Sequence, residues 1–332
     1  MRGPRRRRVA ARITLGKFCA ILATVVVAAA AAAAGQPRPR GTVSVATWNI
    51  RAGHGTLGLR PNPPFDAETK NCTDPARPQN AWGTGFSKRF VQADVGADDD
   101  VIALGLQEAW GDCGNVKNIA ALLGWKAFVP ERNGVGMVAR FGIEGGWDTW
   151  KIESRGVAGA TEDRWIVGGK VCADAGCTRT VHVWATHLSP AADREWPAHV
   201  ARALALLADR KEPHLFIGDF NLWQNDRWSP PTPCGTATAP MAAALALFPR
   251  AGYVDAWAAT QSGPGWTGMV SRRGCGAEKN GSVFKRIDYI WSKGLRPLSA
   301  TRIGVVEPGA PGPSDHLGLK AQFALAADPP PR

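Results

Sequence analysis

The chain has 332 residues, 45% of them hydrophobic, and a formal net charge of +12. This hydrophobic content is ample for a packed core and excludes a chain that is disordered throughout. The first forty residues hold eight Arg, one Lys and no acid, so residues from 41 onward carry only +3. The body of the chain is therefore mildly basic, which neither requires nor excludes a polyanionic substrate.

The first forty residues predict a secretory leader. Four consecutive arginines, Arg5 to Arg8, precede an apolar run over residues 18–34 that ends in small residues suited to cleavage. A Pro-rich joint follows at residues 36–40. The alternative is an uncleaved N-terminal membrane anchor, because about seventeen apolar residues approach the shortest membrane span. We therefore expect an exported protein whose folded domain covers residues 41–328, followed by a tail at residues 329–332.

From residue 41 onward, short β-branched runs alternate with Ala- and Leu-rich helical patterns, without a repeat or a long linker. The predicted strands are Thr42–Trp48, Val101–Leu106, Val135–Ala139, Trp165–Val171, Thr180–Thr186, His214–Ile217, Val283–Trp291, Ala300–Val305 and Leu317–Leu325. The predicted helices are Lys88–Val95, Val116–Leu123, Ala191–Ala208 and Met241–Phe248. Many strands and few helices indicate packed sheets flanked by helices within one domain.

The cysteines outside the leader indicate disulfide bonds. Six remain after Cys19, an even number that is typical of exported, disulfide-bonded chains. Cys172 and Cys177 flank Ala-Asp-Ala-Gly between two predicted strands, where a bridge would close a hairpin. The pairing of the others is left open, and a zinc site is the alternative, although they lack the paired short spacing of a zinc cage. These other four are Cys72, Cys113, Cys234 and Cys275.

Chemically useful side chains recur where the predicted strands end or begin. They are Asn49, Glu108, His187, Asp219 with Asn221, Asp288, Asp315 and His316. Loops at strand ends can gather side chains from distant parts of a chain around one point. Each residue alone has an ordinary explanation, such as a turn-forming Asn, a solvated Glu or an Asp bonded to backbone amides. The whole set at strand ends indicates a catalytic centre.

Three motifs in order carry a resemblance to a known family. Gly-Asp-Phe-Asn at 218–221, Arg-Ile-Asp-Tyr-Ile-Trp at 286–291 and Ser-Asp-His at 314–316 together resemble the endonuclease/exonuclease/phosphatase superfamily of deoxyribonuclease I. The resemblance runs from about Thr42 to Leu325. It implies an α+β fold, a four-layer α/β/β/α sandwich of two mostly antiparallel sheets flanked by helices, with a metal-bound phosphate site at one edge.

The resemblance also implies a metal site. Glu108 resembles the main metal ligand of the family, and Asn49 and Asp315 match residues close to the metal or to its bound water. Carboxylate and amide oxygens suit a hard cation, so we expect Mg²⁺, with Ca²⁺ or Mn²⁺ as alternatives.

The remaining matched residues imply acid–base chemistry. His316 resembles the general base and Asp288 the carboxylate that holds its tautomer. Asp219 would orient the attacking water or serve as the alternative base. His187 matches a residue that donates a proton to the leaving oxygen or binds phosphate.

Two further residues resemble phosphate ligands of the family, Asn221 and Arg164, and the planar donor fork of the arginine fits this task. One position departs from the pattern: Asn133 stands where deoxyribonuclease I has a glutamate that supports the histidine matched by His187, and Glu131 is shifted. An amide orients an imidazole without stabilising its cation, which weakens the proton-donor role of His187.

The sequence predicts an exported, divalent-metal-dependent phosphodiester hydrolase, and a nuclease that acts on DNA or RNA is the favoured prediction. Trp223 and Trp228 are candidates for stacking on bases. The alternatives are a secreted sphingomyelinase acting on lipid head groups, with Trp147 and Trp150 in a membrane-contacting hairpin, or an inositol-phosphate phosphatase. A non-catalytic surface-binding protein on the same fold is the alternative of another class. No obligate protein partner is inferred.

Overall fold

The computed structural model describes residues 41–50, 90–109, 115–130, 134–152, 164–190, 196–210, 213–224, 237–261, 263–269, 283–305 and 314–325. The predicted leader, the tail and four of the six cysteines outside the leader fall outside these ranges. Within them, no helix combines the length and the apolar character needed to cross a lipid bilayer.

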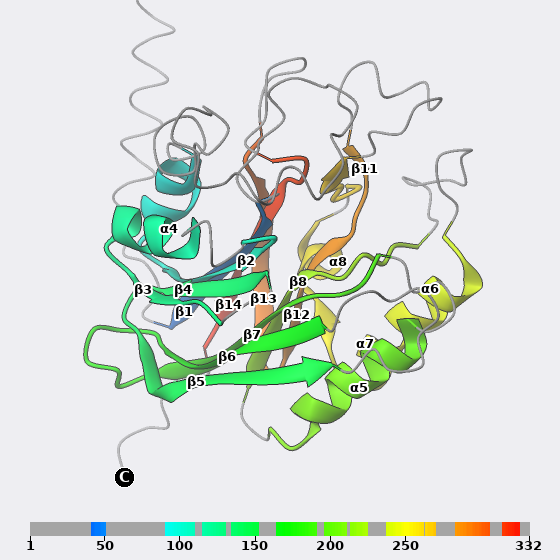
Figure 1. Cartoon of the computed structure of the whole chain (residues 1–332), viewed down its shortest axis with the longest axis horizontal. Helices are drawn as coiled ribbons and strands as arrows, with labels where there is room; N and C mark the ends of the chain where they lie inside the picture. Colours follow the sequence, from blue (N-terminus) through cyan, green and yellow to red (C-terminus); the bar gives the residue numbers. More distant parts are fainter. Residues whose placement is uncertain are drawn as a thin grey trace, which may run out of the picture. The chain divides into compact units, whose positions relative to one another are not determined.

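The strands form two six-stranded sheets and a two-stranded ribbon (Figure 1). The first sheet has the order β13 (Arg296–Ile303), β14 (Gly318–Ala324), β1 (Thr42–Asn49), β2 (Val101–Gln107), β4 (Val135–Ala139) and β3 (Lys126–Phe128). The second has the order β5 (Ile143–Ile152), β6 (Arg164–Cys172), β7 (Thr180–His187), β8 (His214–Asp219), β12 (Asp288–Lys293) and β9 (Val254–Asp255). The ribbon joins β10 (Gly268–Met269) to β11 (Val283–Lys285). Within each six-stranded sheet one pair is parallel, β1 with β2 and β7 with β8, and the other described pairs are antiparallel.

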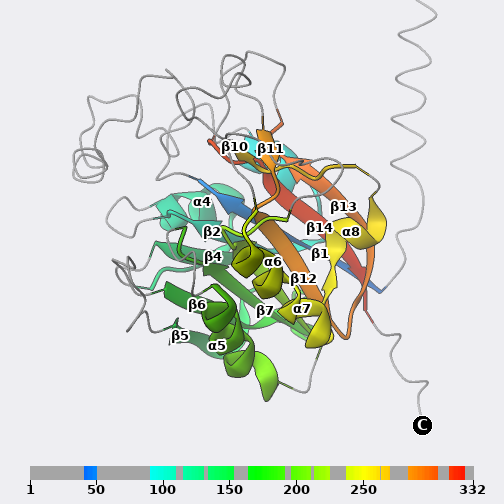
Figure 2. The same ribbon diagram turned by 90° about the vertical axis from the view of Figure 1, so that its right-hand side faces the viewer.

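Helices cover the outer faces of both sheets. The first sheet packs against η3 (Val91–Gly96) and α4 (Asn115–Leu123), and the second against α5 (Trp196–Ala208), α6 (Ala239–Leu245) and α7 (Leu247–Arg250), as Figure 2 shows for the second sheet. In α5 the buried residues recur every three or four positions, the spacing of a helix with one apolar face. A short helix, α8 (Ala256–Thr260), contacts β12 and β13. The layers confirm the predicted α/β/β/α sandwich.

Alternating side chains divide the core into three apolar clusters. On β1, Val43 and Val45 face the second sheet, whereas Ala46 and Trp48 pack beneath η3 and α4. This period of two is the pattern of a strand buried on both faces. It follows that Thr47 and Asn49 continue the inner face of β1 toward the strand's end.

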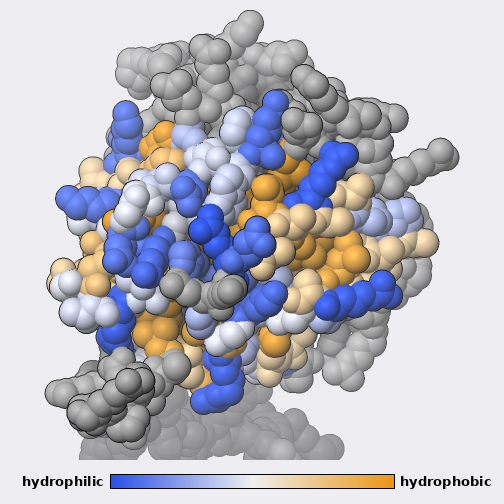
Figure 3. All heavy atoms as spheres, turned by 90° about the horizontal axis from the view of Figure 1, so that it is seen from below, coloured by the Kyte–Doolittle hydropathy of each residue, from blue (hydrophilic) through white to orange (hydrophobic). Residues whose placement is uncertain are grey.

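The surface differs from this core. On the face seen in Figure 3, apolar and polar residues are interspersed.

Two predicted strands differ from the structure. The strand predicted over Val283–Trp291 is divided into β11 and β12, because the backbone N–H groups of Ile287 and Asp288 donate to the side chain of Thr267 instead of continuing one ladder. The strand predicted over Ala300–Val305 is β13, which begins earlier, at Arg296. The added part of β13 contains Pro297; β13 lies at the edge of its sheet, and its register shifts between Pro297 and Ser299. Edge strands tolerate proline.

Other short or irregular elements escaped prediction: β3, β5, β9, β10 and α8. Strand β5 contains Gly145 and Gly146 within a register shift, and most of its residues are exposed, so its pattern lacks a clear apolar alternation. The helix predicted over 88–95 appears as η3, and the helix predicted over 241–248 is divided at Ala246 into α6 and α7. Of the helix predicted over 191–208, residues 196–208 form α5.

The predicted bridge between Cys172 and Cys177 is confirmed. It closes the hairpin between β6 and β7, whose turn is also held by Asp174. The Asp174 carboxylate accepts hydrogen bonds from the backbone N–H groups of Thr178 and Arg179, and these contacts lower the pKa of Asp174.

Candidate active site

Four of the predicted site residues lie at one end of the two sheets. Asn49 ends β1, His187 ends β7, Asp219 ends β8 and Asp288 begins β12. In the second sheet, Asp219 pairs in register with both His187 and Asp288. The sheets approach closely beneath these residues, since a Cβ added to Gly105 on β2 would lie 2.9 Å from Ile217 Cδ1 on β8. Side chains of both sheets therefore meet at this end.

Asp219 is the centre of the cluster and is 1% exposed. Its Oδ2 accepts a hydrogen bond from Asn49 Nδ2 at 3.0 Å and lies 3.4 Å from His187 Nε2 and 3.8 Å from His316 Nε2. Its Oδ1 accepts from the backbone N–H of Asn221 at 2.8 Å. Residues from both sheets thus converge on one buried carboxylate.

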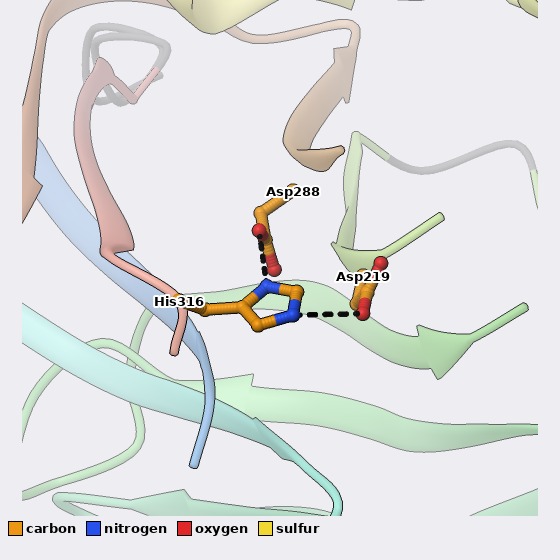
Figure 4. A group of neighbouring side chains, drawn as sticks. All are labelled: Asp219, Asp288 and His316. Carbon is orange, nitrogen blue, oxygen red and sulfur yellow. Dashed lines mark hydrogen bonds and ion pairs between the residues drawn. The ribbon is translucent and has the colours of Figure 1, made fainter. Parts of the chain in front are cut away.

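His316 lies between two carboxylates (Figure 4). Its Nδ1 is 2.9 Å from Asp288 Oδ2, and its Nε2 faces Asp219. A hydrogen bond from Nδ1–H to Asp288 leaves Nε2 as the nitrogen that faces the centre of the cluster. The predicted pairing of Asp288 with His316 is therefore present in the structure.

Ser314 holds the segment that carries His316. Its hydroxyl donates to the backbone carbonyl of Asn49 at 2.6 Å and accepts from the backbone N–H of His316 at 3.2 Å. Trp48 Nε1 donates to the His316 carbonyl at 3.0 Å. These bonds attach the last motif of the sequence to the end of the first strand.

Unusual backbone geometry places three of the motif residues. Glu108 and Asn221 have positive φ values of 52° and 51°, a conformation that residues other than glycine seldom adopt. Gly218 has a φ of 144°, and a Cβ there would lie 2.0 Å from the carbonyl oxygen of Thr186 on β7. Only glycine can thus precede Asp219 at this close approach of strands.

The predicted metal ligands are linked by hydrogen bonds, Asn49 directly to Glu108 and Asp315 through Ser314. Glu108 Oε1 accepts from Asn49 Nδ2 at 3.0 Å, and Asp315 Oδ1 lies 3.4 Å from the Ser314 hydroxyl that binds the Asn49 carbonyl. Oxygen-rich sites of this kind bind hard divalent cations such as Mg²⁺. When bound, such an ion would supply positive charge to the phosphate oxygens of a substrate.

A second group, Asp219, Asp288 and His316, offers one donor atom each, all within 4.8 Å of one another. Asp288 Oδ1 is buried without a hydrogen-bond partner. Together with Glu108 and Asp315, four carboxylates gather at this end of the sheets, which fits a bound divalent cation. Because His316 Nδ1 already bonds Asp288, we keep this group for acid–base chemistry and the first group for the metal.

Burial and charge shift the pKa values in the cluster. Burial, together with the negative charge of Asp288, raises the pKa of Asp219 to about 7. Burial alone would lower the pKa of His316, but Asp288 and Asp219 raise it well above its ordinary value. Burial, with the positive charges of Arg164 and His316, lowers the pKa of His187 well below 6.5. His187 is therefore neutral near pH 7, which favours hydrogen bonding to phosphate over proton donation.

The remaining predicted residues lie in and around this end. Arg164 begins β6 and is close enough to His187 to affect its pKa. Asn221 Nδ2 donates to the carbonyl of Leu188, which fixes the amide beside the cluster. Asn133, Glu131 and Trp228 lie outside the described residues. The structure thus brings together Asn49, Glu108, Arg164, His187, Asp219, Asn221, Asp288, Asp315 and His316.

Three of the tryptophans that the sequence singled out, Trp147, Trp150 and Trp223, lie in the described residues and contact other side chains. Trp147 stacks on Phe128, with ring centroids 4.7 Å apart, and Trp150 packs on Trp184 at 4.3 Å. Both are half-buried on β5, where each ring packs against another aromatic side chain of the fold. Trp223 carries Lys285 Nζ 3.8 Å from its ring centroid, which places a cation on its face where base stacking was expected.

A four-layer sandwich with buried aspartates and histidines clustered at one edge is the fold of phosphoester hydrolases. The model of the Endonuclease/Exonuclease/phosphatase family matches residues 46–316, and the chain belongs to this family. A search of curated protein sequences found no significant match.

Solved structures support the fold. An endonuclease/exonuclease/phosphatase from Beutenbergia cavernae DSM 12333 is 19% identical with a TM-score of 0.58, covering 88% of this chain and 74% of its own. Humanized D. rerio TDP2 is 16% identical with a TM-score of 0.51, covering 85% and 98%. The mannosyl-6-phosphatase Bt3783 of Bacteroides thetaiotaomicron VPI-5482 is 15% identical with a TM-score of 0.54, covering 85% and 100%. At these identities the likeness concerns the fold alone.

Proposed function

We propose that the chain is an exported, divalent-metal-dependent phosphodiester hydrolase that acts as a nuclease. The observation that carries the proposal is the position of His316 between Asp288 and Asp219, beside the bonded pair Asn49 and Glu108. This arrangement places a polarised imidazole, a buried carboxylate and a set of oxygen ligands at one point. Those are the groups that hydrolysis of a phosphodiester needs.

Each group has a role in the proposed reaction. His316 and Asp219 face the same point and act on the attacking water, one accepting its proton and the other orienting it. Asp288 holds the His316 ring. Asn221, neutral His187 and Arg164 bind the phosphate, and Asn49, Glu108 and Asp315 hold the metal. A phosphate oxygen that gains charge during displacement would be stabilised by these fixed donors.

A polyanionic substrate is supported by the cations at the rim. Arg164 lies near His187. The ammonium group of Lys285 lies over the ring of Trp223, and Trp223 follows Asn221 by two residues in the chain. Planar guanidinium groups and ammonium groups of this kind bind nucleic-acid phosphates. A D. rerio TDP2 of the same fold has been solved with a single strand DNA product. Trp147 and Trp150, the residues that favoured a sphingomyelinase, each pack against another ring of the fold, which weakens the case for that alternative.

Export is supported by the predicted leader and by the disulfide bond between Cys172 and Cys177, since such bonds persist in oxidising compartments. The test is to express the full chain and to sequence the N-terminus of protein recovered from the medium. Loss of Arg5–Arg8 is the expected result. Protein that stays with the cell membrane, with this segment intact, would contradict cleavage and favour the anchor.

The activity is tested on a panel of plasmid DNA, RNA, bis-nitrophenyl phosphate, sphingomyelin vesicles, inositol phosphates and a sugar phosphate, with Mg²⁺ or with a chelator. We expect Mg²⁺-dependent cleavage of DNA or RNA, and its loss in Asp219→Ala and His316→Ala. The surface variant Lys170→Ala, which breaks an ion pair with Glu144 on the β5–β6 pair, is the control. Hydrolysis of vesicles or monoesters with intact nucleic acid would overturn the nuclease assignment. If none of these substrates were hydrolysed, the result would favour the alternative of a non-catalytic surface-binding protein.

A further inference from the structure

Thr267 lies outside every motif that the sequence singles out, yet it is fully buried beside the site. Its hydroxyl oxygen accepts hydrogen bonds from the backbone N–H of Ile287 at 3.3 Å and of Asp288 at 3.1 Å. One hydroxyl oxygen has two acceptor positions, so this pair of bonds uses both. The side chain of Thr267 thus fixes the backbone at the start of β12, where Asp288 lies.

The backbone of Thr267 bonds to the same segment again and to the segment before β14. Its N–H donates to the carbonyl of Lys285 at 2.9 Å, and its carbonyl accepts from the N–H of Leu317 at 2.8 Å. The next residue, Gly268, pairs with His316 in an isolated antiparallel bridge. One residue therefore holds the segment that carries Asp288 and the segment that carries His316.

This link matters because Asp288 and His316 come from different sheets. Asp288 begins β12 in the second sheet, and His316 precedes β14 in the first. Their 2.9 Å contact therefore joins the two sheets, and no single ladder of backbone hydrogen bonds fixes both residues. Thr267 bonds to both sides of this contact.

We propose that Thr267 is a positioning residue that sets the Asp288–His316 pair, and through it the orientation of the His316 ring. The proposal rests on the proposed hydrolytic function. Without the hydroxyl, the Ile287 and Asp288 N–H groups lose their acceptor, and Asp288 is free to move away from His316. A displaced catalytic group lowers the turnover rate, kcat, with little effect on substrate binding.

The experiment compares Thr267→Val, which keeps the shape and removes the hydroxyl, with Thr267→Ser, which keeps the hydroxyl. For Thr267→Val we expect kcat to fall about 10- to 100-fold with KM within about twofold. Thr267→Ser should stay within about threefold of the wild type. The matched control is Ser292→Ala, which removes another buried hydroxyl on β12, one that donates to the backbone carbonyl of Val254 on β9 away from the site. Its kcat should be unchanged.

A double-mutant cycle separates positioning from a general structural role. If Thr267 acts through Asp288, adding Thr267→Val to Asp288→Ala should lower kcat by less than about twofold, because the partner is already gone. The proposal would be overturned if the kcat losses of the two single variants multiplied in full in the double variant. It would also be overturned by a wild-type kcat for Thr267→Val, or by a kcat loss in Thr267→Ser as large as that in Thr267→Val.

Circular dichroism and thermal melting establish that each variant is folded. Should Thr267→Val yield too little folded protein, Thr267→Ala takes its place, with a kcat loss of at least about fivefold expected and a wild-type kcat contradicting the proposal. Failure of the proposed function is distinguishable, since the wild-type protein would then hydrolyse no member of the substrate panel.

Discussion

Asn49 in the first sheet donates to Asp219 in the second across 3.0 Å, joining residues that lie 170 positions apart in the chain. The same amide nitrogen also donates to Glu108 Oε1 at 3.0 Å. One neutral side chain therefore separates two carboxylates that would otherwise repel each other. This contact couples the predicted metal ligands to Asp219, the residue predicted to orient or deprotonate the attacking water.

Replacement of Asn49 by Ala should weaken metal binding and activity together. Without the amide, Glu108 and Asp219 both lose a donor that orients them, so the Mg²⁺ concentration for half-maximal activity should rise about 10- to 100-fold. The measurement is a Mg²⁺ titration of the hydrolysis rate and, independently, of thermal stability. Gln322→Ala is the control, because Gln322 also donates its amide to a carboxylate, that of Asp100, on the far part of β14. An unchanged Mg²⁺ requirement for Asn49→Ala would remove Asn49 from the metal site.

Gly218→Ala should disrupt the strand that presents Asp219. The added Cβ would lie 2.0 Å from the Thr186 carbonyl oxygen, and φ at this position is 144°. We expect a loss of at least about 2 kcal/mol in the free energy of unfolding, measured in urea, together with a large loss of activity. Gly263→Ala is the matched control, since a Cβ there meets no atom within 4 Å. Equal stability of the two variants would contradict the close approach of β7 and β8.

The alternation of apolar residues made much of this site predictable. It placed the ends of β1, β2, β7 and β8 within two residues, and so placed Asn49, Glu108, His187 and Asp219 at strand ends. The break before Asp288 was not predictable, because the acceptor that interrupts the ladder is Thr267, which is distant in the sequence. Strand β5 was missed because its residues are mostly exposed and its glycines hide the period.

The contacts that hold the site together are less visible in the sequence than the site residues themselves. Gly105 shows no local reason to be glycine, and the approach of Ile217 and Ala185 from the second sheet explains it. Trp150 was a candidate for an exposed hairpin, whereas its ring packs against Trp184 on β7, two strands away in the same sheet. Long-range packing of this kind has no local pattern.

The stability of the metal-free protein should depend on pH through His187. Burial and the positive charges of Arg164 and His316 lower its pKa in the folded state well below 6.5. In the unfolded chain it gains a proton near pH 6.5, so its contribution to stability is present above that pH and is lost as the pH falls toward the folded-state value. The variant His187→Gln has no imidazole to protonate, so it lacks this loss of stability at low pH. Relative to the wild type, the variant should therefore gain stability between about pH 6.5 and 5.

Urea unfolding of both proteins in chelator, across this pH range, measures the difference. Comparison with His182→Gln, a histidine on the same strand at the end away from the site, controls for loss of any strand histidine. A stability difference that does not change with pH would mean that His187 titrates alike in the folded and unfolded states.

Arg164 should act on His187 through charge and on the substrate through its donors. Arg164→Gln removes the positive charge that helps to lower the pKa of His187, so that pKa should rise toward 6.5. The histidine signals in an NMR titration of the metal-free protein report this change without any turnover. In the presence of metal, kcat/KM for a phosphodiester should fall about 10- to 1000-fold, because a fixed donor to the phosphate is lost.

Arg164→Lys distinguishes the two effects. Lysine keeps the charge but not the planar fork, so the His187 pKa should stay low while kcat/KM recovers only in part. Arg179→Gln, which removes an arginine paired with Asp174 at the hairpin turn, should change neither quantity. If Arg164→Gln left the His187 titration in place but abolished activity, the arginine would bind phosphate without setting the charge of the imidazole. Full activity of Arg164→Gln would exclude it from the phosphate site.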